Sequence, residues 1–149
     1  MSLQTKVMDA LKEAMKAKDT IALESLRAIK SAILLAKTEA GAAAELAEEE
    51  ELKLLQKLVK QRKDSAALYA QQGRSDLAEP ELAQVAVIEK FLPKQLSEAE
   101  VTEAVKAIIA EVGATSAKDM GKVMGVATKQ LAGKTDGKVI SAIVKSLLA

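Results

Sequence analysis

The chain has no cysteine and no histidine among its 149 residues. This composition excludes disulfides, zinc sites of the Cys/His type, haem ligation by histidine, cysteine nucleophiles and Ser-His-Asp triads. Aromatic residues are limited to Tyr69 and Phe91, and tryptophan is absent. Because stacking on bases requires aromatic platforms, any nucleic-acid binding by this chain has to act through phosphates and shape.

Long apolar runs and nucleotide-binding loops are also missing. No apolar run reaches the roughly 18 residues of a membrane-spanning helix, and there is no signal-peptide pattern, so we expect a soluble, cytoplasmic protein. The glycines match neither the Walker loop nor the dinucleotide fingerprint. We find no nucleophile with a plausible base, and therefore predict no catalytic residue and no cofactor.

Proline is scarce, with two residues, whereas alanine, leucine, lysine and glutamate are abundant. This composition predicts an all-α fold, and the apolar spacing divides it into about seven helices. We expect an N-terminal helical domain at 1–93, with an antiparallel hairpin in a bundle of four helices. A compact three-helix domain at 94–149 follows. The Pro93-Lys94 joint marks the boundary between the two domains and is too short for a flexible linker.

In the N-terminal domain the helices are expected at residues 2–17, from Asp19 or Thr20 to about 38, from the glutamate run at 48 to about 72, and from the turn at 73–76 to about 92. Pro80 is placed in the first turn of the fourth helix. The predicted core positions share helical spacing: Leu3, Val7, Ala10, Leu11, Ala14, Met15, Ala22, Leu26, Ile29, Ile33, Leu52, Leu55, Leu58, Val59, Ala66, Tyr69, Leu82, Val85, Ile88 and Leu92.

Three polar features of the N-terminal domain are candidate sites. Four consecutive carboxylates at 48–51 suggest a metal, but consecutive residues point around a helix, so we interpret them as a helix start and predict no metal site. Arg62 falls on an apolar face, where we expect a structural ion pair with an acid such as Glu81 rather than a ligand-binding role. Arg74 lies in the following turn.

In the C-terminal domain, Ser97 and Glu100 form a predicted capping box, and Asp136 is expected to cap the last helix. The last helix should bury one face, composed of Val139, Ile140, Ile143 and Leu147. The helix before it should bury Met120, Val123, Met124, Ala127 and Leu131. Opposite that face runs a narrow stripe of Lys118, Lys122, Gly125 and Lys129, with Gly121 beside it.

Glycine inside a helix costs about 1 kcal/mol relative to alanine. Gly121 and Gly125, four residues apart, therefore suggest that something approaches the backbone closely. A neighbouring helix is the commoner explanation in soluble proteins, and a phosphate backbone is the other. The charge distribution is compatible with a phosphate backbone. Residues 113–149 carry six lysines and two aspartates (net +4), whereas residues 1–112 have a net charge of −3.

The chain resembles the GatB/YqeY family in two blocks that cover nearly its whole length. The C-terminal block comprises Gly121-Lys122-Val123-Met124-Gly125, Gly133-Lys134-Thr135-Asp136-Gly137-Lys138-Val139 and Val144-Lys145-x-Leu147-Leu148. The N-terminal block comprises Lys60–Ser65, Tyr69, Gly73-Arg74, Asp76-Leu77-Ala78, Glu81 and Phe91–Leu96. Three positions depart from the family: Lys134 replaces arginine, Phe91 replaces tyrosine, and Gln84 lies where a further acid is common.

The resemblance implies a non-catalytic accessory that binds tRNA as the tail domain of tRNA-dependent amidotransferases does. The candidate contacts are Lys118, Gly121, Lys122, Gly125, Lys129, Gly133, Lys134, Gly137 and Lys138. An alternative is a protein-interaction module that docks on an aminoacyl-tRNA synthetase or amidotransferase through Arg62 or the fourth helix. A third is participation in glutamine-dependent carbon–nitrogen ligase activity, implied by the family alone, because amidotransferase catalysis lies outside the tail domain.

Overall fold

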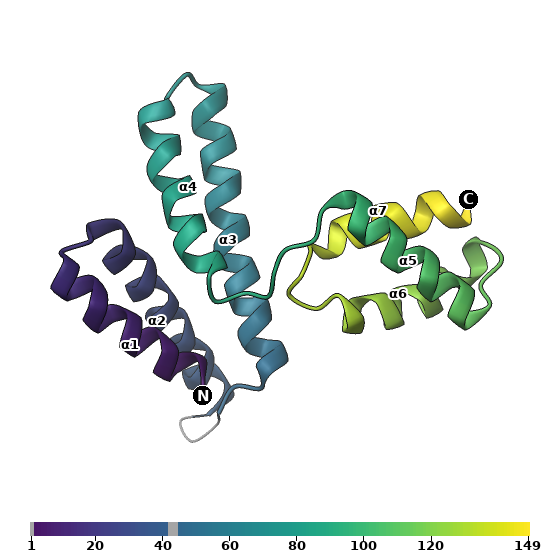
Figure 1. Cartoon of the computed structure of the whole chain (residues 1–149), viewed down its shortest axis with the longest axis horizontal. Coiled ribbons are helices and arrows are strands. Elements are labelled where there is room, and N and C mark those ends of the chain that lie inside the picture. Colours follow the sequence, from purple (N-terminus) through teal and green to yellow (C-terminus); the bar gives the residue numbers. More distant parts are fainter. Residues whose placement is uncertain (1, 42–44) are drawn as a thin grey trace. The chain divides into compact units, whose positions relative to one another are not determined.

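The computed structural model describes residues 2–41 and 45–149. Within them the chain is α-helical and contains no strand, which confirms the all-α prediction. No helix in this part of the chain is long and apolar enough to cross a membrane. The elements are α1 (Leu3–Ala17), α2 (Thr20–Ala40), α3 (Glu48–Gln71), α4 (Ser75–Glu89), α5 (Glu98–Val112), the short 3₁₀ helix η1 (Ala117–Asp119), α6 (Met120–Gln130) and α7 (Gly137–Leu148) (Figure 1).

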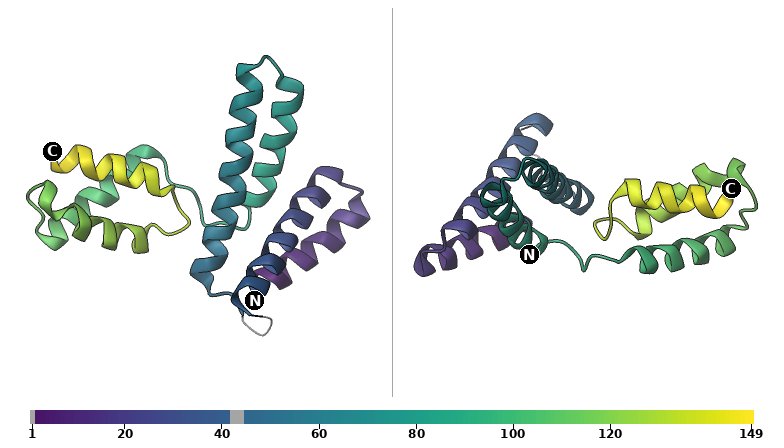
Figure 2. Two further views of the ribbon diagram at one scale, coloured as in Figure 1. Left: turned by 180° about the vertical axis from the view of Figure 1, so that it is seen from behind. Right: turned by 90° about the horizontal axis from the view of Figure 1, so that it is seen from above.

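Two separate hydrophobic cores divide the chain into compact units, Met1–Leu92 and Pro93–Ala149. In the first unit, α1 and α2 form one antiparallel hairpin and α3 and α4 form another, and α2 packs against both α3 and α4 (Figure 1). Ile29 and Ile88 are fully buried in its core. In the second unit, α5, α6 and α7 contact one another pairwise, as Figure 2 shows, around Val105, Val123 and Val144.

Local signals in the sequence set most helix starts. The hydroxyl of Ser2 and the carboxylate of Asp19 accept backbone N–H groups at the starts of α1 and α2. Ser97 and Glu100 form the predicted capping box, and Asp136 caps α7. The α3 helix begins with its four glutamates at the positive end of the helix dipole, which confirms that these carboxylates mark a helix start.

Three predicted core residues are wrong, because Met15, Leu82 and Leu147 have relative exposures of 56%, 50% and 36%. On α7 the buried stripe runs through Ile140, Val144 and Leu148 at intervals of four residues, one position away from Leu147. The stripe on each helix is narrower than the apolar pattern, since only the part that faces a neighbour is covered.

The α4 helix begins earlier than expected, so placing Pro80 in its first turn was wrong. The carbonyl of Arg74 accepts the N–H groups of Leu77 and Ala78, both at 3.1 Å, and this turn starts the helix at Ser75. Pro80 therefore lies inside α4 and has no N–H to donate to the preceding turn. The helix ends at Glu89 instead of near residue 92.

Candidate nucleic-acid interface

The α6 helix presents the glycine–lysine stripe to solvent. Val123 and Ala127 on its opposite side are fully buried, and Met120 and Met124 are partly buried against the same core. This apolar side fixes the rotation of the helix, because turning it would expose these residues. The stripe, all exposed, comprises Lys118 of η1 and Gly121, Lys122, Gly125 and Lys129 of α6, and we call it the α6 face.

No other element of the second unit packs on the glycines of the α6 face. Apart from neighbouring residues of its own helix, a β-carbon built on Gly121 or Gly125 would meet no atom within 4 Å, and the same is true of Gly137 at the start of α7. Packing against another helix of the second unit, the commoner explanation for such glycines, therefore does not occur here. The rest of that unit leaves the backbone of α6 uncovered at both positions.

The charge around this surface is positive. The α6 and α7 helices contain no aspartate or glutamate. The two acids nearest in sequence each accept a backbone N–H: Asp119 accepts that of Thr115 at 3.0 Å, and Asp136, the N-cap of α7, accepts that of Lys138 at 2.9 Å. Across residues 2–41 and 45–149, none of the salt bridges involves a lysine of η1, α6, α7 or the turn between them.

The turn that joins α6 to α7 holds Gly133, Lys134 and Gly137. Gly133 is buried with φ of 75°, a left-handed conformation that glycine adopts without strain. The N–H of Lys134 donates to the carbonyl of Leu131 at 3.0 Å, so this amide points into the turn rather than toward a ligand. The amide of Lys134 is therefore not free to bind a phosphate. The side chains of Lys134 in the turn and of Lys138 at the start of α7 are exposed.

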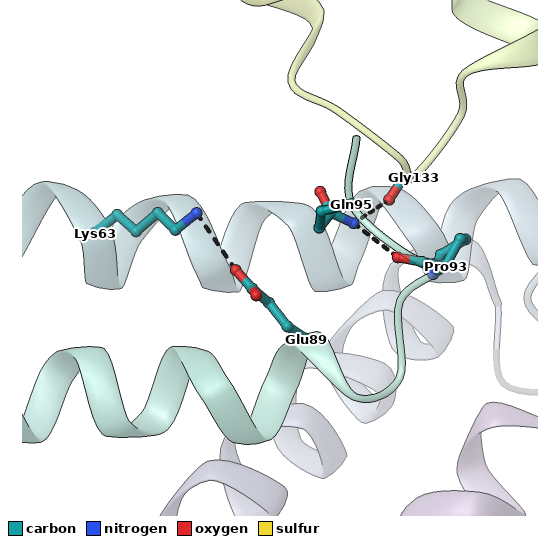
Figure 3. Close-up of polar contacts among 5 residues, drawn as sticks. All are labelled: Lys63, Glu89, Pro93, Gln95 and Gly133. Carbon is teal, nitrogen blue, oxygen red and sulfur yellow. Dashed lines mark hydrogen bonds and ion pairs between the residues drawn. The ribbon is translucent and has the colours of Figure 1, made fainter. Parts of the chain in front are cut away.

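Gln95 was absent from the predicted site residues, yet it holds this turn from outside. Its side-chain amide donates to the carbonyl of Gly133 at 2.7 Å and to that of Pro93 at 3.0 Å (Figure 3). The N–H of Leu96 donates to the carbonyl of Lys134 at 2.9 Å. Gln95 belongs to the N-terminal block of family resemblance, and Gly133 belongs to the C-terminal block. Its place in the first block is the sequence signal that could have identified Gln95.

In the first unit, Arg62 does not pair with Glu81, and that prediction was wrong. Its Nε donates to Oε1 of Gln84 at 2.8 Å, and one terminal nitrogen donates to the carbonyl of Leu58 at 3.1 Å. The amide of Gln84 in turn donates to Glu24 at 3.2 Å. Gln84 reaches Arg62 because it projects from α4 at the level of Arg62 on α3, a register that sequence spacing does not give.

Arg74 lies apart from this chain of hydrogen bonds and makes a bidentate pair with Asp76, at 3.0 and 2.9 Å. The hydrogen bond to Arg74 lowers the pKa of Asp76 below its usual value. Both side chains are more than half exposed, so the pair adds little to stability.

A pocket of about 250 Å³ opens in the first unit, and its lining includes Glu48 and Glu51 of the glutamate run but neither Arg62 nor Arg74. No side chain lining it is a nucleophile of the serine, threonine or tyrosine type. No group of three acids capable of holding a metal occurs within residues 2–41 and 45–149. The pocket is lined by Leu3, Lys6, Glu48, Glu51, Leu52, Leu55 and Phe91.

Comparison with known proteins adds two findings. The family model of Yqey-like proteins matches residues 4–148, nearly the whole chain. The chain is also 35% identical over 123 residues to "Altered inheritance of mitochondria protein 41, mitochondrial" of Clavispora lusitaniae (strain ATCC 42720), a match covering 81% of this chain and 69% of that protein.

Proposed function

The chain belongs to the Yqey-like protein family, and on that basis we propose that it is a non-catalytic RNA-binding accessory that contacts tRNA phosphates through its C-terminal unit. The observation that carries the proposal is the open backbone of the α6 face, where Gly121 and Gly125 have no neighbour within 4 Å of a β-carbon. The two glycines lower helix stability without serving packing inside the second unit.

Phosphate is the partner that fits this surface best. Lys122 and Lys129 lie seven residues apart on one side of α6, roughly 10 Å along the helix axis. They flank Gly125, so a phosphate chain can lie against bare backbone with an ammonium group at either end. The second unit, Pro93–Ala149, contains no aromatic residue, so it offers no platform for stacked bases. Paired regions of tRNA are therefore the proposed target.

The proposal extends the sequence resemblance to the tail domain of the GatB subunit of tRNA-dependent amidotransferases. In this proposal the second unit binds the tRNA, and any chemical step belongs to a partner enzyme. The proposal does not include ligase activity, because the sequence shows no nucleophile with a plausible base and no nucleotide-binding loop.

The test is the affinity of the full chain for total tRNA across a salt series. A few lysine–phosphate contacts predict a log–log slope of about −0.9 for each contact on duplex regions. Reversing Lys122 and Lys129 to glutamate should abolish binding and leave the melting temperature nearly unchanged. The matched control reverses the exposed Lys57 and Lys60 of α3, which changes the net charge equally. Equal loss of tRNA affinity in both double variants would show that net charge alone attracts the tRNA, and would refute the assignment of binding to α6.

A second function, docking on an aminoacyl-tRNA synthetase or amidotransferase, is favoured by one observation. Arg62 is partly buried, yet its hydrogen-bond partners are the neutral Gln84 and a backbone carbonyl. Its charge is thus not compensated by a direct carboxylate contact in the described part of the chain, and an acidic side chain of a partner could supply one. Retention of such an enzyme on the immobilised protein after nuclease treatment, lost on Arg62→Ala, would support docking over RNA binding.

A further inference from the structure

Gln95 connects the segment that precedes α5 to the turn between α6 and α7. Both N–H donors of its side-chain amide are used, toward the carbonyls of Pro93 and Gly133 at 3.0 and 2.7 Å (Figure 3). The backbone bond from Leu96 to Lys134, at 2.9 Å, lies one residue further along each segment. These contacts attach the turn to residues 38 positions earlier in the sequence.

The attached turn carries two of the lysines that we assign to phosphate binding. Lys134 follows Gly133 directly, so fixing the carbonyl of Gly133 and that of Lys134 fixes the backbone on both sides of the Lys134 side chain. Lys138 is tied to the same turn through its N–H, which donates to Asp136 at 2.9 Å. Neither lysine has a carboxylate partner of its own to hold it among the described residues.

We propose that Gln95 is a positioning residue for RNA binding: it holds the α6–α7 turn so that Lys134 and Lys138 present their charges to phosphates beside the α6 face. This inference rests on the proposed function. Its physical basis is that a turn free to move pays the entropy of ordering when it binds, whereas a turn already held does not. Gln95 itself need not touch the RNA.

The test compares wild type, Gln95→Ala, Gln95→Glu and Lys134→Ala/Lys138→Ala in binding to total tRNA across a salt series. Gln95→Glu keeps the size of the side chain and replaces its donors with a carboxylate facing two carbonyl oxygens. We expect Gln95→Ala to weaken binding about threefold to tenfold and to leave the salt slope unchanged, because both lysines still reach their phosphates once the turn is ordered. Gln95→Glu also adds a negative charge and should weaken binding further. Adding Gln95→Ala to the double lysine variant should cause no further loss.

Amide hydrogen exchange at Leu96 gives a readout that does not depend on RNA. Faster exchange in Gln95→Ala is expected, because the bond from Leu96 to Lys134 loses its support. The control is Gln130→Ala at the exposed end of α6, which should leave exchange and affinity unchanged.

The outcomes separate the inference from the function on which it rests. Unchanged affinity in Gln95→Ala, or a full additional loss in the triple variant, overturns the positioning role while tRNA binding by wild type stands. If wild type itself does not bind, the proposed function fails and the RNA role of Gln95 fails with it, whereas the exchange data still show whether Gln95 holds the turn.

Discussion

Replacing Gly125 with alanine should make the protein more stable and a weaker RNA binder. Gly125 is the sixth of eleven residues in α6, and a β-carbon there would meet no atom within 4 Å. The substitution therefore gains the helix propensity of alanine, about 0.8–1.0 kcal/mol, without a steric cost. For a unit of this size the gain corresponds to a rise in melting temperature of about 4–8 °C.

The effect on binding should have the opposite sign. If a phosphate chain lies against the bare backbone of α6, the added methyl group keeps it away, and we expect affinity for total tRNA to fall about tenfold, or about 1.4 kcal/mol. Gly121→Ala should act in the same direction with a smaller gain in stability, because Gly121 is the second residue of α6 and lies in its first turn.

The assay pairs thermal unfolding by circular dichroism with tRNA binding at fixed salt. Ser146→Ala, an exposed change in α7 that also favours helix, serves as the control that raises stability without touching the α6 face. A lower melting temperature of Gly125→Ala than of wild type would refute the conclusion that space is open beside Gly125. Higher stability with unchanged affinity would refute the use of that face by RNA.

Two predictions concern stability alone. Gln84→Ala should lower the free energy of unfolding by about 1–2 kcal/mol, measured in urea, because the partly buried guanidinium of Arg62 loses its acceptor; a change of only a few tenths would show that water replaces the amide. Hydrogen bonds from the backbone and hydroxyl of Ser97 lower the pKa of Glu100 below its usual value of 4.5. The Glu100 carboxylate therefore contributes to stability above pH 4.5, and this contribution is lost as the pH falls through the lowered pKa. Ser97→Ala should move the pKa of Glu100, followed by NMR, back toward 4.5, and an unmoved pKa would contradict this cause.

Much of the architecture follows from local signals. The caps at Ser2, Asp19, Ser97 and Asp136 can be recognised because each needs only its own side chain and the next turn. The stripe of α6 could be predicted for the same reason, since a 3.6-residue period places Ala127 nearly opposite Gly125 and Lys129 whatever surrounds the helix.

Apart from the start of α4, the predictions that were wrong depend on contacts between elements. Helical spacing put Arg62 on the inner side of α3, but only the register of α4 decided that Gln84, and not Glu81, is its partner. Periodicity likewise marked Leu82 as apolar without showing that no neighbour covers it.

The sequence by itself determined the helices, their caps and the apolar side of each, because these depend on neighbours within a turn or two. The tertiary structure alone decided that no other element of the second unit packs on Gly121 and Gly125, and that Gln95 reaches Gly133 across 38 positions. Both facts concern residues distant in the sequence, whose approach is set by how whole helices pack against one another.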